Sequence, residues 1–155
     1  MTAAGATISY EPSDDNRTTR GAALAAAGAA QTAGDTYHLS HNADYEGSEL
    51  LFTVQVSVYG NGATLHRPAG VAFTHLLRFN AAGSSLRNLT INGGAAANAG
   101  TGMGLAVVGA DFVGTDIHIK GIRSDAETNG FGLWLNSADR STFDGLRIED
   151  VTYSG

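Results

Sequence analysis

Residues 77–79 (LRF), 105–107 (LAV) and 133–135 (LWL) recur at a constant offset of 28 residues, and this repeat decides the fold. Each is followed by a second apolar-polar-apolar unit, at 89–91 (LTI), 117–119 (IHI) and 146–148 (LRI), the last two being 29 residues apart. A repeat with two such short strands cannot bury its apolar face alone, so successive repeats must stack. The pattern predicts a β-solenoid in which each period is one coil.

The alternation within each unit also predicts which side chains point inward. Corresponding strands should stack in parallel about 4.8 Å apart, so that equivalent residues form columns. The expected internal columns are Leu89, Ile117 and Leu146, and Ile91, Ile119 and Ile148. The residues between them, Thr90, His118 and Arg147, should then face outward.

Three strings carry a family resemblance: VSVYGNGATL (56–65), LRNLTINGG (86–94) and FDGLRIEDV (143–151). They resemble the right-handed parallel β-helices of the pectin lyase-like superfamily, over about residues 18–155. We therefore expect an all-β fold, a right-handed single-stranded parallel β-helix of about four to five coils with an N-terminal capping α-helix. The superfamily includes polysaccharide lyases, hydrolases and epimerases as well as phage tailspikes and other virion proteins, so the fold does not assign an activity.

Three segments precede or make up the expected coils. Residues 1–17 read as an N-terminal arm, 18–34 as the capping helix and 35–155 as coils. Thr18 and Thr19 offer N-cap hydroxyls to the Ala-rich stretch 20–33, and Gly34 is a stop signal. A helix this short and apolar needs a surface to lie on. By the resemblance, it covers the apolar cross-section and the unpaired strand edges at the start of the solenoid.

Within the coils, Tyr37 and Leu39 are expected to point inward, and the run 60–62 (GNG) should form a sharp corner with positive φ angles. The longer stretches 66–75, 93–104 and 121–132 each precede one of the LRF-type units. We expect these three loops to stack into one lateral surface, where functional residues would collect.

Composition excludes several partners. The 155 residues carry a net charge of −6 with one Lys and eight Arg, which argues against nucleic acid as a partner. The absence of Cys rules out a disulfide framework and a thiolate metal site. No run has the length of a membrane span, and the N-terminus lacks a basic region followed by an apolar one, which disfavours a secreted enzyme.

Lyases and epimerases of the superfamily, as the resemblance implies, use carboxylates to hold Ca²⁺ together with an Arg, Lys or His base. The acids of this chain do not obviously converge. Asp111 and Asp139 are equivalent in the repeat and should be turn residues that bind local backbone N–H groups. Asp125 and Glu127, on the loop before residue 131, are better ligand candidates, although a solvated loop is the simpler interpretation. We expect no catalytic residue, no metal and no cofactor.

A candidate binding surface consists of Trp134, Arg78, His118, Arg147 and Asp125. Alternation places Trp134 outward, beside Ala106 and Arg78, where it could stack on a sugar ring or anchor a protein interface. The alternative is that the loop 121–132 folds over the indole.

His118 and Arg147 should be neighbours in one outward column, with no acid beside them in that column. Lys120 and Glu149 fall in the next column, where they could form an exposed ion pair between coils.

The last recognisable coil finishes at Val151, and no C-terminal cap is visible in the sequence. The cross-section formed by Leu135, Leu146 and Ile148 must therefore be covered by another chain, by a continuation of this one, or by a homotypic contact. This favours a structural or binding protein that works inside an assembly.

Our first functional hypothesis is a non-catalytic protein of a bacteriophage virion surface, either a capsid decoration protein or a tailspike-like module. Its partners would be other virion proteins or copies of itself, in a homo-oligomer such as a trimer, with a cell-surface glycan as a further ligand and no membrane contact. The alternative is an extracellular polysaccharide lyase, hydrolase or epimerase of the superfamily, or the N-terminal part of one. A free-standing carbohydrate-binding domain is a third interpretation.

Overall fold

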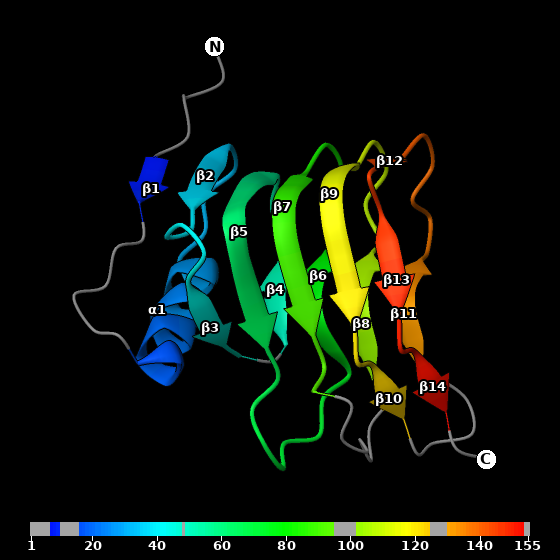
Figure 1. Ribbon diagram of the computed structural model, residues 1–155. Helices are drawn as coiled ribbons and strands as arrows, with labels where there is room; N and C mark the ends of the chain where they lie inside the picture. The colour runs from blue at the N-terminus through cyan, green and yellow to red at the C-terminus, as the bar shows by residue number, and fades with distance from the viewer. Residues whose placement is uncertain (1–6, 10–15, 48, 95–101, 125–129, 154–155) are drawn as a thin grey trace.

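A computed structural model of the chain describes residues 7–9, 16–47, 49–94, 102–124 and 130–153. These residues form a parallel β-solenoid of about three turns with one α-helix near its N-terminal end (Figure 1). The helix is α1 (Arg17–Ala29), and the strands are β1 (Thr7–Ser9), β2 (Asp35–His38), β3 (Asp44–Glu46), β4 (Leu50–Phe52), β5 (Val56–His66), β6 (His75–Phe79), β7 (Ser85–Asn92), β8 (Met103–Val107), β9 (Val113–Lys120), β10 (Arg123–Ser124), β11 (Phe131–Leu135), β12 (Thr142–Asp144), β13 (Arg147–Glu149) and β14 (Thr152–Tyr153).

Two parallel sheets form the walls of the solenoid (Figure 1). Sheet A has the strand order β1-β2-β5-β7-β9-β12, with β3 also beside β5 and β13 also beside β9; sheet B has the order β11-β8-β6-β4. A short additional pair joins β10 to β14. The solenoid has about three turns instead of the four to five expected, and its first and last passes through sheet A consist of short strands (β2, β3, β12 and β13).

The register keeps the 28-residue offset of the sequence. The aligned columns include Leu77–Leu105–Leu133 in sheet B, and Leu89–Ile117, Ile91–Ile119–Ile148 and Thr90–His118–Arg147 in sheet A. Ile91 and Ile119 are fully buried, whereas Thr90 and His118 are only partly buried. The predicted assignment of inward and outward positions is therefore confirmed for these columns.

An aromatic stack, which the sequence did not predict as a unit, runs through the interior from coil to coil. Successive ring centroids lie 5.1–5.6 Å apart along the series Tyr37, Phe52, Phe79, Phe112 and Phe143. Tyr37 and Phe143 come from sheet A, Phe52 and Phe79 from sheet B, and Phe112 from the corner between β8 and β9, so the stack joins the two walls. Such aromatic pairs contribute about 0.5–1.5 kcal/mol each beyond the apolar area that they bury.

The helix differs from its prediction at both ends. It begins at Arg17 because Asn16, and not Thr18 or Thr19, is the N-cap: the Asn16 side chain accepts a hydrogen bond from Thr18 N at 2.9 Å. It ends at Ala29 instead of continuing to residue 33, because the next residues bind elsewhere: Gln31 reaches β4, and Thr32 N donates to the Asp35 carboxylate at 2.7 Å.

The helix lies beside β3 and β4 at the N-terminal end of the solenoid (Figure 1), as expected of a cap. Gly21 permits the close approach, since a Cβ at this position would lie 1.7 Å from the Glu46 carbonyl oxygen. Leu24 is buried against the core, and Arg17 Nε binds the Glu46 carboxylate at 2.6 Å. Part of the arm also belongs to this end, because β1 pairs in parallel with β2.

The GNG run does not separate two strands as expected. Residues 56–66 form one strand, β5, whose register with β7 shifts between Tyr59 and Ala63. Asn61 and Gly62 have the expected positive φ angles, 53° and 78°. Gly60 is needed for a different reason, since a Cβ there would lie 2.3 Å from the Asn88 carbonyl oxygen in the next coil. The corner is thus a bend within a continuous strand.

The C-terminal end of the solenoid is open over the described residues. Leu135 is 49% exposed and Ile148 is 43% exposed, although equivalent residues in earlier coils are fully buried. Strands β11, β12 and β13 lie at the ends of their sheets. The exposed apolar cross-section predicted from the sequence is confirmed for Leu135 and Ile148, whereas Leu146 is partly buried and packs against the core.

Candidate functional site

On the outer face of sheet B, Arg78 and Trp134 lie on either side of Ala106 in one register column. The Arg78 guanidinium carbon is 6.0 Å from the centroid of the Trp134 ring, a cation-π distance. Ala106 is only 1% exposed, and it lies between these two large side chains in the register column. Trp134 is outside the core and half-buried, as the alternation predicted.

A hydrogen bond fixes the orientation of this pair. Arg78 Nε donates to Asn80 Oδ1 at 2.7 Å, while the guanidinium carbon lies over the Trp134 ring. The outer face of sheet B thus carries an aromatic ring beside a cation that is bonded to an amide. Groups of this kind can bind a sugar ring with an anionic substituent or a protein side chain.

On the outer face of sheet A, the Glu149 carboxylate binds both candidate bases, His118 and Arg147. His118 Nε2 lies 2.7 Å from Glu149 Oε1, and Arg147 Nη2 donates to Glu149 Oε2 at 2.5 Å. The hydrogen bond with His118, reinforced by Arg147, lowers the pKa of the Glu149 carboxyl from its usual value. Glu149 is therefore an anion over a wide pH range.

This arrangement corrects two expectations. His118 and Arg147 have no acid in their own column, but Glu149 in the next column reaches His118 diagonally across the strands and Arg147 along its own strand, and it pairs with them and not with Lys120. The physical reason is that one step between strands and two along the strand is within reach of a Glu side chain. The sequence signal was the spacing of Arg147 and Glu149, which puts both on one face of β13.

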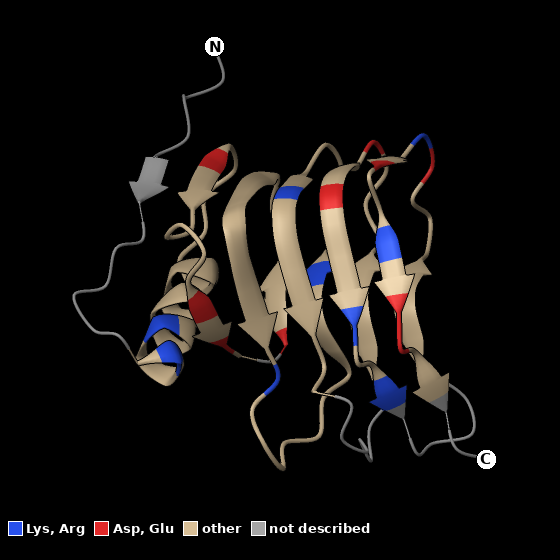
Figure 2. Ribbon diagram, in the orientation of Figure 1, with Lys and Arg blue, Asp and Glu red and all other residues tan. Residues whose placement is uncertain are grey.

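The candidate binding surface predicted from the sequence is divided by the fold. Trp134 and Arg78 lie on sheet B, whereas His118 and Arg147 lie on sheet A, so these residues do not form one lateral site. Asp125 lies outside the described residues, as do parts of the loops expected to stack beside it. Figure 2 shows the charged residues mainly on the strands of sheet A and on the turns, whereas the four strands of sheet B carry a single charged residue, Arg78.

Asp111 is a turn residue, as expected, with a left-handed φ of 57°, but its carboxylate does not bind local backbone. Both carboxylate oxygens of Asp111 accept hydrogen bonds from Arg140, at 2.7 Å each, so the contact runs between coils and not to local backbone. This bond holds the pKa of Asp111 below its usual value and raises that of Arg140. Because both side chains are exposed, the pair fixes geometry more than it stabilises the fold.

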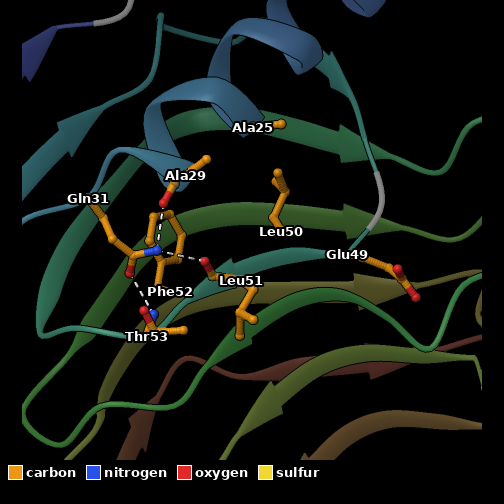
Figure 3. A pocket seen from close by; sticks show the side chains of 9 residues that line it. Ala25, Ala29, Gln31, Glu49, Leu50, Leu51, Phe52 and Thr53 are labelled. Atoms are coloured by element: carbon orange, nitrogen blue, oxygen red, sulfur yellow. Dashed lines mark hydrogen bonds between the residues drawn. The ribbon is translucent and has the colours of Figure 1, made fainter.

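A groove of about 280 Å³ lies between α1 and β4 (Figure 3). Its walls are mainly apolar, and Gln31 lies at one end and Glu49 at the other. Gln31 Oε1 accepts from Thr53 N at 2.5 Å, and Gln31 Nε2 donates to Leu51 O at 3.1 Å. The amide thus satisfies the free edge of β4 as a neighbouring peptide would, which no sequence motif indicated.

His75, at the start of β6, is a further unpredicted residue. It is 8% exposed, and neither ring nitrogen has a hydrogen-bond partner among the described residues. Burial, together with the positive charge of Arg78 and against the opposing effect of Glu49, lowers the pKa of His75 from its usual 6.5. The imidazole is thus kept neutral, an unsatisfied group in the wall of the solenoid.

Within the described part of the chain, no three His, Cys, Asp or Glu side chains converge as metal ligands. No helix in that part is long and apolar enough to cross a membrane. Comparisons with protein-family models, with curated proteins and with solved structures found no match. The described residues thus form a parallel β-solenoid with two separate clusters on its outer faces: Trp134 with Arg78 on sheet B, and His118, Glu149 and Arg147 on sheet A.

Proposed function

We propose that this chain is a non-catalytic structural and binding module that works within a polypeptide assembly, with the exposed apolar residues at one end of the described solenoid in contact with another polypeptide segment. The observation that carries the proposal is the exposure of Leu135 and Ile148 at that end, while α1 covers the other end. Apolar groups beside free strand edges favour association with another polypeptide.

The ion pairs of two acidic side chains, Glu149 and Asp111, support a non-catalytic role. Glu149 is paired with His118 and Arg147, and Asp111 with Arg140. Lyase-type proton abstraction requires a base and a cation at one sugar ring. The candidate bases on sheet A and the Trp134–Arg78 pair on sheet B lie on different walls, so they do not act on one bound sugar.

The setting that we propose is the surface of a bacteriophage virion, as a capsid decoration protein or a tailspike-like module. The support is the resemblance of residues 56–65, 86–94 and 143–151 to the pectin lyase-like superfamily, which includes such virion proteins. The partners would be other virion proteins or further copies of the chain. Peptide mass spectrometry of purified phage particles from the source of the gene should detect the protein; particles without it would contradict the setting but not the assembly role.

The assembly role is tested by measuring the native mass with light scattering. We expect the wild-type chain to form an oligomer, and Leu135→Asp and Ile148→Asp to reduce it to the monomer, since each places a charge in the contact. Leu51→Asp is the matched control, because Leu51 is 38% exposed but lies in β4 beside α1. A monomeric wild-type chain would contradict the proposal.

An activity assay tests the absence of catalysis. We expect no cleavage or epimerisation of acidic polysaccharides, with or without Ca²⁺. An unsaturated product absorbing in the ultraviolet, lost on His118→Ala or Arg147→Ala, would instead support the polysaccharide lyase.

Glycan binding is a second candidate function, and the Trp134–Arg78 pair is the observation that favours it. Titration calorimetry with a panel of acidic oligosaccharides would detect binding, and Trp134→Ala should weaken it by roughly 1–3 kcal/mol through loss of the stacking surface. His118→Ala, on the other wall, is the control and should leave the affinity unchanged. Equal losses for both variants would contradict a site at Trp134.

A further inference from the structure

Lys120, on the outer face of sheet A, has an acid beside it in its register column and yet no counter-ion. It ends β9, and its register partners are Asn92 on β7 and Glu149 on β13. Ile119 is fully buried, so alternation turns the half-buried Lys120 side chain outward. Within the described residues, the Lys120 ammonium group forms no ion pair and no hydrogen bond.

Glu149 does not neutralise Lys120 because both of its carboxylate oxygens have other partners. Oε1 lies 2.7 Å from His118 Nε2, and Oε2 accepts from Arg147 Nη2 at 2.5 Å. The two contacts hold the carboxylate toward His118 and Arg147. A half-buried cation is thereby left to pair with a group from outside the chain.

The polar groups around Lys120 are donors whose neighbouring acceptors are already in use. Asn92 Oδ1 accepts from Gly94 N at 2.9 Å, so the amide NH₂ remains to donate. Thr90 lies two residues earlier on the same face of β7 and is also half-buried. Neither the Asn92 NH₂ nor the Thr90 hydroxyl has a partner in the described part of the chain. An ammonium, an amide and a hydroxyl thus lie together with free N–H and O–H groups.

The backbone fixes the spacing of these donors. Gly93 N donates to Lys120 O at 3.0 Å, and a Cβ on Gly93 would lie 2.5 Å from the Gly121 carbonyl oxygen, so the ends of β7 and β9 are closely packed. Register partners on neighbouring strands are about 4.8 Å apart. Donors at that spacing can bind two oxygens of one anionic group, and the hydrogen bond from a cation is the strong one.

We propose that Lys120, Asn92 and Thr90 form a binding site for a single oxyanion group, which is a carboxylate, a sulfate or a phosphate. Lys120 supplies the charge, and the contacts of Glu149 with His118 and Arg147 keep a competing carboxylate away from it. This oxyanion site goes beyond the assembly role proposed above. It also involves neither end of the solenoid, since β7 and β13 lie on either side of β9.

Amide NMR of the isotope-labelled full chain tests the site. Sodium acetate, sulfate and phosphate are each titrated at constant ionic strength, with sodium chloride as the reference. We expect saturable shifts of the Asn92 side-chain NH₂ and of the Lys120 amide. Tighter binding of acetate would identify a carboxylate ligand, and tighter binding of sulfate or phosphate a tetrahedral one. Shifts of the same size with chloride would overturn the site.

A pair of charge-removing variants tests the role of Lys120. Lys120→Gln should weaken oxyanion binding at least about tenfold, because it removes a hydrogen bond from a charged donor. Arg87→Gln is the matched control, since it removes another cation of β7–β9 from the same outer face without touching the site. An equal loss in both variants would show a general attraction of anions and would overturn the site.

Glu149→Gln tests why Lys120 is available. It removes the competing carboxylate, so it should strengthen oxyanion binding, and it should have no effect when combined with Lys120→Gln. Weaker binding in Glu149→Gln would overturn the proposed role of Glu149. Far-UV circular dichroism verifies that each variant is folded.

The native mass separates this inference from the assembly role. Light scattering should give the same mass for Lys120→Gln as for the wild-type chain, because the oxyanion site is remote from Leu135 and lies on the other sheet. Loss of oxyanion binding with an unchanged mass supports a separate site. A change of mass in Lys120→Gln would overturn that separation and place Lys120 in the assembly contact.

Discussion

The two ends of this solenoid differ in how their apolar side chains and strand edges are covered. A coil at either end has a cross-section of apolar side chains and strand edges that no further described coil covers. At the N-terminal end, α1 buries Leu24 against the core and Gln31 bonds to the edge of β4, whereas at the C-terminal end Leu135 and Ile148 stay exposed. Local features of the first coil therefore bury apolar side chains and bind strand-edge groups that the last described coil leaves exposed, although the coils are nearly alike.

The largest effect that we expect comes from breaking the covered end. Gly21→Ala would place a Cβ against the Glu46 backbone and push α1 off the solenoid, with a loss of more than about 3 kcal/mol in the free energy of unfolding. Urea denaturation followed by circular dichroism measures the loss.

Gly28→Ala is the matched control, because its Cβ would meet the Phe52 ring at an ordinary 3.7 Å. Ala has a higher helix propensity than Gly, by about 1 kcal/mol, so this variant should be neutral or slightly stabilised. Similar losses for both variants would show that the glycines act through something other than the Glu46 contact.

The next effect compares a middle rung with the last one. Ile119 and Ile148 share one internal column, but Ile119 is fully buried while Ile148 is not. Ile119→Ala should destabilise by about 2–5 kcal/mol, because it leaves a cavity among packed side chains. Ile148→Ala should cost under about 1.5 kcal/mol when measured at concentrations below any association. Equal losses would mean that the C-terminal end is covered within the monomer.

A smaller effect is expected at the edge of β4. Gln31→Ala removes the acceptor of Thr53 N and the donor to Leu51 O, and should cost about 1–3 kcal/mol. Gln55→Ala removes an exposed bond to Gly83 O and should cost less than about 1 kcal/mol. Both values come from urea denaturation, and a loss at Gln31 no larger than at Gln55 would contradict the role of Gln31 in sealing the edge.

The smallest effect is a pH dependence that originates at His75. Its pKa is lower in the folded chain than the usual 6.5, so the unfolded chain binds the extra proton as the pH falls. The contribution of His75 to stability is therefore complete above about pH 6.5 and is lost as the pH falls through the folded pKa.

His75→Phe should remove this part of the loss between pH 7.5 and pH 5.5, and should not weaken the fold at pH 7.5, because the buried ring nitrogens have no partner to lose. Denaturant titrations of both proteins at the two pH values measure the difference. Parallel losses in the wild-type chain and in His75→Phe would assign the pH dependence to another group.

Repetition in the sequence determined most of the fold. The units at offset 28 predicted parallel stacked strands, the inward columns of sheet A and the outward position of Trp134, because one register repeated in every coil places each residue type without further information. The same reasoning predicted the exposed residues of the open end. A local signal, the Ala-rich run, predicted the capping helix but not its first and last residues.

Only the tertiary structure decided how side chains of neighbouring coils meet. The diagonal bond between His118 and Glu149, the closure of the β4 edge by Gln31 and the separation of Trp134 from His118 onto two walls all depend on distances across coils and corners. Sequence alternation specifies the face on which a residue lies, but a contact between coils also depends on the bend of each strand and on the rotamers of its neighbours. For that physical reason the repeat determined the solenoid, while the composition of its outer clusters and the contacts that cover its N-terminal end appeared only in three dimensions.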